Sequence, residues 1–115
     1  MDIAQTEQLV VSALEDIKAK DIQVIDTTRI SALFERVVIA SGDSNRQTRA
    51  LARNVADKAR EAGIEIVGIE GEGSGEWVLV DLGAIVVHIM QPAVRSYYNL
   101  EELWATTPAR PRRAA

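Results

Sequence analysis

The chain has 115 residues, a formal net charge of −4, 47% hydrophobic residues and 26% charged residues. That length and balance indicate a single globular domain with a core of its own. The absence of cysteine excludes disulfides and zinc–thiolate sites, and the single histidine excludes a centre built from several histidines.

The distribution of charge and apolar residues also indicates the location of the protein and the class of partner that it binds. No apolar run approaches the length that crosses a bilayer, and the polar N-terminus fits neither a signal peptide nor a transit peptide, so we expect a cytoplasmic protein without membrane contact. All 17 acidic residues precede residue 105, whereas three arginines follow it. An acidic body predicts a basic protein partner and little direct contact with nucleic acid.

Four elements are predicted in the first forty residues: a helix at 2–19, a strand at 22–26, a helical turn at 28–33 and a strand at 34–40. Asp2 and Gln5 form a capping pair at the start of the helix. Alternation puts Val37 and Ile39 on one face of the second strand. The other face of that strand carries Phe34, Arg36, Val38 and Ala40.

A second helix is expected from residue 44 to about residue 62. Ser44 and Gln47 form a capping box at its start, and Gly63 suits the position after its end. The polar side of this helix carries four arginines, which we expect to face solvent: Arg46, Arg49, Arg53 and Arg60. A third strand follows at 64–69, and then a loop rich in glycine and glutamate.

The centre of the fold is predicted to be a β-hairpin built from residues 76–82 and 84–90, which are rich in β-branched residues. With Gly83 and Ala84 as its two-residue turn, alternation sends one aliphatic set of side chains into the core: Val78, Val80, Leu82, Ile85, Val87 and Ile89. The opposite face carries a mixed set: Trp77, Leu79, Asp81, Val86, His88 and Met90. Two interpretations of the mixed face stay open, a surface for a partner or a surface that helices cover.

Beyond the hairpin, Pro92 ends the last strand, and residues 93–104 are expected to form turns and a short helix that starts near Asn99. Residues 105–115 lack an apolar pattern and are predicted to be disordered. The folded domain, residues 1–104, is therefore of the α/β class, with a single mixed sheet and two main helices.

The sequence lacks the patterns of the common catalytic centres. The glycine loop at 71–75 matches neither the dinucleotide nor the P-loop spacing and is surrounded by glutamates. The sequence around His88 shows no nucleophile elbow for it to assist, and Asp81 has no partner in an Asp-x-Asp or Asp-x-Glu pair with which to share a metal. We therefore predict a binding module that is not an enzyme and that uses no cofactor or metal.

Three stretches stand out by their motifs: ALEDIKAKDIQVID at 13–26, VVIASGDSNRQTRALA at 37–52 and GIEGEGSGEWVLVDLGAIVVHIMQPAVRSYYNLEELW at 68–104. Together they closely resemble the ribosomal silencing factors, also called Iojap-like proteins, over nearly the whole predicted domain. The chain departs from the family pattern at Gln47, Ala84 and Met90, where family members often have His, Asp and Phe. These departures affect single contacts and leave the resemblance in fold intact.

This resemblance implies a fold similar to that of nucleotidyltransferases but without their catalytic carboxylates. It also implies that the protein binds the large ribosomal subunit, at the large-subunit protein numbered fourteen, and sterically blocks joining of the small subunit when nutrients are scarce. Maturation of the large subunit is the alternative role, and a residual nucleotidyltransferase-type activity is a more distant one. Many family members form homodimers, so a second copy of the chain is a further expected partner.

Eight residues are predicted to contact the partner, because Trp and Tyr are favoured as interface anchors and acidic groups suit a basic ribosomal protein. They are Trp77, Leu79, Asp81, His88, Tyr97, Tyr98, Glu70 and Glu76. Three alternatives stay open: the arginine side of the second helix is the interface, the mixed hairpin face is the self-contact of a dimer, or Trp77 belongs to the core. Trp104 is expected to pack in the core and to dock the last helix.

Overall fold

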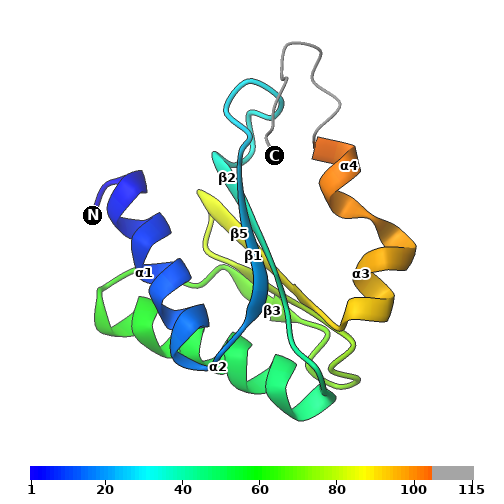
Figure 1. Ribbon diagram of the computed structural model, residues 1–115. Helices are drawn as coiled ribbons and strands as arrows, with labels where there is room; N and C mark the ends of the chain where they lie inside the picture. The colour runs from blue at the N-terminus through cyan, green and yellow to red at the C-terminus, as the bar shows by residue number, and fades with distance from the viewer. Residues whose placement is uncertain (105–115) are drawn as a thin grey trace.

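The computed structural model describes residues 1–104, so the predicted disordered tail at 105–115 and the side chain of Trp104 lie outside what is described. A five-stranded sheet forms the middle of the molecule, with strand order β1-β2-β5-β4-β3 (Figure 1). β2 and β5 run parallel, and the other neighbouring strands are antiparallel. The elements are α1 (Ile3–Asp16), β1 (Lys20–Asp26), β2 (Arg36–Ser41), α2 (Asn45–Glu61), β3 (Gly68–Glu70), β4 (Trp77–Asp81), β5 (Ile85–Met90), α3 (Pro92–Tyr98) and α4 (Leu100–Trp104).

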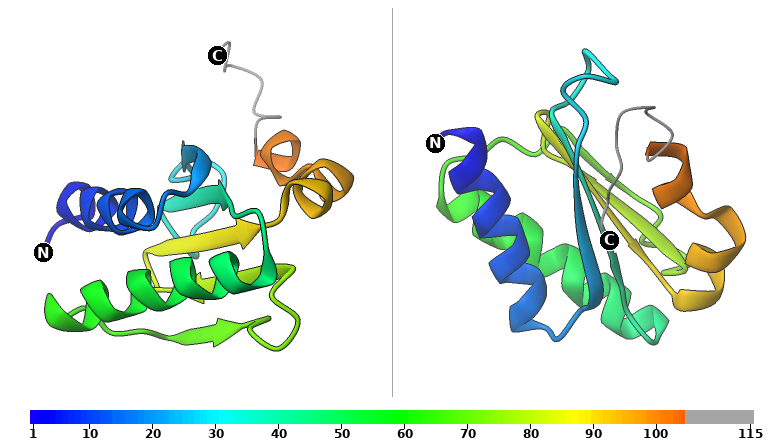
Figure 2. Two further views of the ribbon diagram at one scale, coloured as in Figure 1. Left: turned by 60° about the horizontal axis from the view of Figure 1, so that its bottom comes forward. Right: turned by 45° about the horizontal axis from the view of Figure 1, so that its top comes forward.

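Helices lie on both sides of this mixed sheet, but unequally (Figure 2). α1 and α2 lie side by side over one face, here called the helix-covered face, and enclose the main core with it. Leu14 of α1, Leu51 of α2 and Ile89 of β5 are among its largest fully buried side chains. The short helices α3 and α4 pack on the other face, here called the second face, through Val94 and Leu100.

The predicted hairpin register is confirmed. Val78 pairs with Ile89 and Val80 pairs with Val87, while the N–H of Leu82 donates to the carbonyl of Ile85 at 2.9 Å. All six side chains that were expected to point inward are buried in the main core: Val78, Val80, Leu82, Ile85, Val87 and Ile89. Truncating buried side chains of this kind typically costs about 1–5 kcal/mol, so the hairpin anchors the helix-covered face.

α1 is shorter than the predicted helix at 2–19. Its N-terminal capping box of Asp2 and Gln5 is confirmed. At the other end, Lys18 adopts a left-handed φ of 60°, and its N–H donates to the carbonyl of Glu15 at 2.9 Å. Together with the bond from Ala19 N–H to the Leu14 carbonyl, at 3.0 Å, this is a Schellman motif. Glycine is the usual residue there, so the sequence carried no signal for the end of the helix.

Gln47 does more than the predicted capping box requires. Its N–H donates to Ser44 Oγ at 3.1 Å as expected, but its Oε1 accepts from the N–H of Asp43, at 2.7 Å, and not from that of Ser44. Its Nε2 donates to the carbonyls of Ile17 and Lys18, at 3.1 and 3.2 Å. One side chain therefore joins the start of α2 to the end of α1.

The connection between β1 and β2 differs from the predicted helical turn at 28–33. The N–H groups of Ile30 and Ser31 both donate to the carbonyl of Thr27, at 2.9 Å, and form a hydrogen-bonded turn without a helix. Phe34 lies before β2 and packs with the second-face cluster, so its predicted place beside Val38 is wrong. Strand alternation does not extend to a residue outside the strand.

Two further segments are corrected. The predicted strand at 64–69 is reduced to β3, because Ile64 and Ile66 pack against the core from an irregular segment and only the last residues pair with β4. Residues 92–98 form α3 where turns were expected, since Pro92 sits at the start of the helix, where its missing N–H costs nothing. Asn99 ends α3 in a left-handed conformation, and α4 follows it as predicted.

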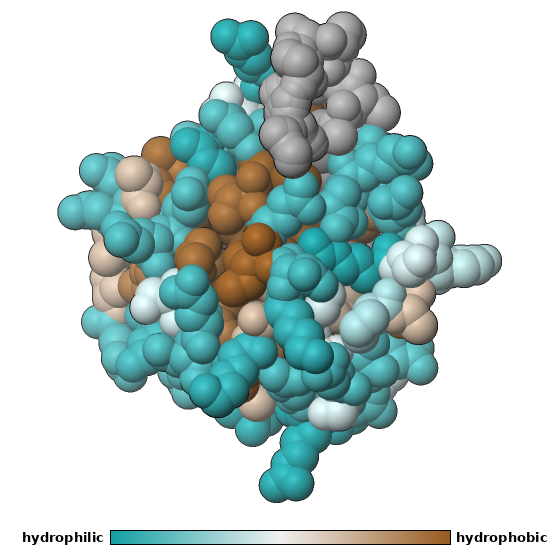
Figure 3. Space-filling model, viewed as in Figure 1, coloured by the Kyte–Doolittle hydropathy of each residue, from teal (hydrophilic) through white to brown (hydrophobic). Residues whose placement is uncertain are grey.

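β1 is an edge strand whose exposed ends are charged. It starts with Lys20 and Asp21, contains an irregularity before Gln23 and finishes with Asp26. Near the middle of Figure 3, beside β1, apolar side chains reach the surface, and Ile22 and Val24 of β1 are half-buried. Charges and a bulge at such an edge oppose pairing with a foreign strand, so this apolar strip is protected against edge-to-edge association.

We expect Gln47→Ala to lower the free energy of unfolding by about 1–2 kcal/mol, because three backbone groups at the junction of α1 and α2 lose their partner. Denaturant unfolding followed by circular dichroism measures the change. Arg46→Ala, at an exposed position in the same helical turn, is the matched control and should shift it by less than about 0.5 kcal/mol. An unchanged midpoint for Gln47→Ala would show that water replaces these bonds without loss.

Candidate functional site

The predicted contact residues of the hairpin share the second face of the sheet. Strand pairing sets one row straight across all five strands: Gln23, Ile39, His88, Leu79 and Glu70. Trp77 and Asp81 lie in the rows on either side, opposite Met90 and Val86. Side chains that are paired across strands point to the same face, so one register brings together five of the eight predicted residues.

α3 and α4 cover only part of this second face. Val37, Ile39 and Met90 are fully buried in the cluster against which these helices pack. Leu79 and His88, on β4 and β5, are only half-buried. The interpretation that helices cover the mixed face holds for only one part of it, because side chains of β4 and β5 stay accessible. The interpretation as a partner surface stays a prediction.

Four aromatic rings form a continuous chain from the hairpin to α3. Trp77 Nε1 donates to His88 Nδ1 at 3.0 Å, and the Tyr98 ring lies 4.9 Å from that of Trp77. Tyr97 meets Tyr98 edge-on at 5.0 Å. Tyr97 and Tyr98 are 81% and 54% exposed, whereas Trp77 is half-buried and packs against the second-face cluster. Trp77 therefore belongs to the core and to the surface at once.

His88 is held in its neutral form. Burial lowers the pKa of its imidazole from 6.5 to about 4. Because Nδ1 accepts the Trp77 N–H, the proton of the neutral ring lies on Nε2. The ring adds no positive charge to the second face near neutral pH, so it does not repel a basic partner.

The three predicted carboxylates have different places. Asp81 Oδ1 accepts from the N–H of Gly83 at 2.8 Å, so Asp81 also holds the hairpin turn. Glu70 lies on β3 opposite Leu79 and is exposed on the second face. Glu76 is exposed too, but it directly precedes Trp77, and alternation does not place it on that face.

Two glycines allow the loop between β3 and β4 to fold closely onto its surroundings. Gly71 has a φ of 88°, and a Cβ there would lie 2.0 Å from the carbonyl oxygen of Trp77. Gly75 has a φ of 75°, and a Cβ there would lie 3.0 Å from Asn45 at the start of α2. Both positions need glycine for backbone conformation and close approach. The presence of these two glycines is therefore explained by the fold, and no phosphate-binding role is needed to account for them.

The arginine side of α2 is only partly solvated. Arg46, Arg53 and Arg60 are exposed as predicted, but Arg49 is half-buried and donates to the carbonyls of Glu72 and Gly73. The prediction was therefore wrong for Arg49. These partners lie 23 and 24 residues further along the chain, so no local pattern could have found them.

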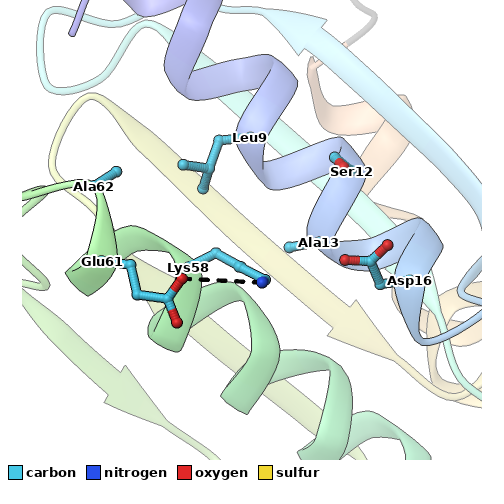
Figure 4. A pocket seen from close by; sticks show the side chains of 7 residues that line it. All are labelled: Leu9, Ser12, Ala13, Asp16, Lys58, Glu61 and Ala62. Carbon is cyan, nitrogen blue, oxygen red and sulfur yellow. Dashed lines mark ion pairs between the residues drawn. The ribbon is translucent and has the colours of Figure 1, made fainter.

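A separate open groove of about 380 Å³ lies between α1 and α2 (Figure 4). Lys58 and Glu61 form a surface ion pair of 3.9 Å beside it. Its lining residues are Leu9, Ser12, Ala13, Asp16, Lys58, Glu61 and Ala62. It includes none of the eight predicted contact residues, so the groove and the second face are distinct surfaces.

Within residues 1–104, no three or more His, Asp or Glu side chains gather into a group that could hold a metal ion. The helices described in that range are all too short or too polar to cross a bilayer. What the second face offers is shape, accessible apolar and aromatic side chains, and exposed negative charge, which together favour the binding of another macromolecule.

Known proteins of similar sequence and structure match nearly the whole chain. A family model described as "Ribosomal silencing factor during starvation" matches residues 1–114. A "Ribosomal silencing factor RsfS" of Chromobacterium violaceum is 57% identical over 104 residues, which cover 90% of this chain and 85% of the relative. A crystal structure of a protein from Chromobacterium violaceum has a TM-score of 0.90 at 53% identity and covers 100% of this chain and 97% of that one. A Mus musculus protein named "Mitochondrial assembly of ribosomal large subunit protein 1" is 33% identical over 99 residues, or 84% of this chain and 43% of the mouse protein.

His88 is the single histidine of the chain, so its pKa can be measured by NMR without overlap. We expect the imidazole to titrate near pH 4, because burial disfavours the charged ring. A titration midpoint near 6.5 would contradict the burial of this ring.

The same shift predicts how His88 makes stability depend on pH. Between pH 6.5 and about 4 the unfolded chain binds the proton and the folded chain does not. The contribution of His88 to the free energy of unfolding is therefore fully present above pH 6.5 and falls with pH, by up to about 3 kcal/mol. His88→Gln should lack this component, so the difference between the two pH profiles isolates it from the carboxylates.

Proposed function

The chain belongs to the family of ribosomal silencing factors, and on that premise we propose that it binds the large ribosomal subunit through the second face of its sheet and prevents the small subunit from joining. The proposal includes repression of translation when nutrients are scarce. One observation carries it: accessible aromatic and apolar side chains continue from β4 and β5 onto α3, with exposed carboxylates beside them.

The aromatic chain supplies the proposed anchors. Trp and Tyr dominate binding energy at protein interfaces because each buries a large area with few rotatable bonds. Trp77 is already oriented by its bond to His88 and by contact with Tyr98. A partner would therefore meet a surface that is ordered before binding, which reduces the entropy lost on association.

The charge of the site favours a basic protein partner. Glu70 and Asp81 lie on the second face, and Glu72 and Glu76 are exposed in the adjoining loop. Complementary charge speeds encounter and sets orientation. We propose the large-subunit protein numbered fourteen as that partner, with little direct contact to ribosomal RNA, because phosphates would be repelled by these carboxylates.

Occlusion needs no chemistry, only a bound body of sufficient size. The molecule extends 37 × 34 × 21 Å. A standard interface of about 800 Å² per partner fits on a domain of this size. Even the smallest extent, 21 Å, is several times the contact distance of about 4 Å between packed atoms. Bound where the subunits meet, the domain would hold their surfaces apart.

Assembly of the large subunit is the second candidate function. The name of the mouse relative refers to that process, and a factor that binds the same face of the subunit could act during its maturation. The two functions share the second face and differ in the particle that is bound, a precursor or a mature subunit.

A second copy of the chain is the other proposed occupant of the second face. The exposed tyrosines and the half-buried Trp77 and Leu79 offer the apolar area that a self-contact needs. A homodimer formed this way would compete with subunit binding. Light scattering with and without large subunits measures the mass of the protein in solution and so tests this competition. A cytoplasmic location is also part of the proposed function.

Co-sedimentation with separated ribosomal subunits is the direct test, followed by a subunit-joining assay. The proposal expects binding to the large subunit alone and a loss of joined ribosomes as the protein is added. Binding to mature large subunits without any effect on joining would favour the assembly role. Absence of binding to either subunit would overturn both.

We expect Leu79→Arg to abolish co-sedimentation with the large subunit. Leu79 lies half-buried in the middle row of the second face, where a long charged side chain would hold the partner away. Ala62→Arg is the matched control, because Ala62 is exposed beside the groove between α1 and α2. Both variants should keep the wild-type circular dichroism spectrum. If the folded Leu79→Arg variant binds the large subunit as well as the wild type does, the interface lies on another surface of the protein.

We also expect Asp81→Asn to slow association with the large subunit several-fold at low salt, with a smaller effect at high salt. Asparagine keeps an oxygen that can accept from Gly83 N–H, so the hairpin turn is preserved while the charge is lost. Asp16→Asn removes an equal charge from the rim of the groove and should leave the rate near that of the wild type. Equal slowing by both variants would indicate a long-range effect of net charge alone.

A further inference from the structure

The loop between β3 and β4 presents carboxylates without using them internally. Glu70, at the end of β3, and Glu72 and Glu76, in the loop, are all exposed. Among the side-chain contacts of residues 1–104, none pairs these three carboxylates with a cation or a hydrogen-bond donor. Three nearby negative charges repel one another and favour an extended, variable loop, so something else must hold its conformation.

The backbone of the loop is held from α2. Arg49 Nε donates to the carbonyl of Glu72 at 2.7 Å, and Arg49 Nη2 donates to the carbonyl of Gly73 at 2.9 Å. One residue nearer the start of the helix, Thr48 Oγ1 donates to the carbonyl of Gly75. Thr48 is fully buried and its bond closes the loop on α2. The loop is thereby fastened through its carbonyls, which leaves its carboxylates free.

The guanidinium group suits this task for two reasons. Its planar fork donates two hydrogen bonds in fixed directions, which defines the positions of two successive carbonyls. Its positive charge also lies next to the loop that carries Glu72, where it offsets the repulsion among the carboxylates. A lysine at this place would supply the charge but not the fork.

We propose that Arg49 is a positioning residue, which orders the loop at 71–76 so that Trp77 and the neighbouring carboxylates are presented in a fixed arrangement to a basic protein partner. This inference rests on the proposed function for the identity of the partner. The ordering of the loop by Arg49 does not depend on the proposed function. Gly71 and Gly75 fit the same role, because any larger residue there would push the loop away from Trp77 and from Asn45.

The other arginines of α2 make this proposal testable. Arg53 lies one turn beyond Arg49 and is exposed. Arg49→Gln and Arg53→Gln therefore remove the same charge from the same helix. Attraction of a more negative protein to a basic partner would strengthen binding for both variants. Loss of loop order predicts the opposite sign, weaker binding, for Arg49→Gln alone.

Two measurements on the full chain separate the steps. Hydrogen exchange of the amides at 71–76 reports the order of the loop, and titration with purified large subunits reports binding. For Arg49→Gln we expect faster exchange confined to this loop and a dissociation constant raised roughly tenfold through lost pre-organisation. Arg53→Gln should match the wild type in exchange and should not weaken binding. Arg49→Lys, which keeps the charge, should show partly restored binding.

Each other outcome contradicts the proposal. Unchanged exchange in folded Arg49→Gln would show that Arg49 does not order the loop. Faster exchange with undiminished binding would show that the partner does not use the ordered loop. Equal weakening by Arg49→Gln and Arg53→Gln would assign the effect to charge on α2. If the wild-type protein fails to bind large subunits, the proposed function fails, whereas the exchange data still decide whether Arg49 orders the loop.

Discussion

The register between β4 and β5 is the constraint on which the rest of the structure depends. The turn is fixed by the bond from Gly83 N–H to Asp81 and by that from Leu82 N–H to the Ile85 carbonyl. A slip of one residue would turn the aliphatic side chains of one strand to the second face and bring either Trp77 and Asp81 of β4 or His88 of β5 under α1 and α2. The helix-covered face can form a dry core only in the observed register, and the composition of the second face follows from it.

The proposed contact surface is accessible because α3 and α4 cover the second face unevenly. Arg95 of α3 donates to Ser41 Oγ at 2.9 Å and pairs with Glu101 of α4 at 2.6 Å, which ties both short helices to the end of β2. From there Val94 and Leu100 complete the small cluster of Val37, Ile39 and Met90. Leu79 and His88 stay accessible beside it. α3, which helps to protect one part of the face, adds Tyr97 and Tyr98 to the other.

Order before binding is the common theme of the polar contacts around the site. The Trp77 N–H is satisfied by His88, and the carbonyls of the acidic loop are satisfied by Arg49 and Thr48. With these groups paired inside the molecule, the surface formed by residues 1–104 keeps apolar rings and exposed carboxylates that suit the proposed partner. The proposed occlusion needs affinity and shape, and pre-organised side chains provide affinity at a low entropic cost.

Local sequence patterns were enough to predict the hairpin register, the capping of α1 and the α/β class. They also predicted that Trp77, Leu79, Asp81 and His88 share one face of the sheet. Alternation and capping act between near neighbours in the sequence, so they can be recognised without the tertiary structure. The resemblance to ribosomal silencing factors also came from the sequence alone. Tertiary structure decided the end of α1 before Lys18, the packing of Phe34 and the partial cover by α3 and α4. It also decided the Trp77–His88 bond and the hydrogen bonds from Arg49 to the loop. Most of these depend on contacts between residues far apart in the chain, and the left-handed turn at Lys18 lacks the glycine that usually marks one, so no local spacing reveals them.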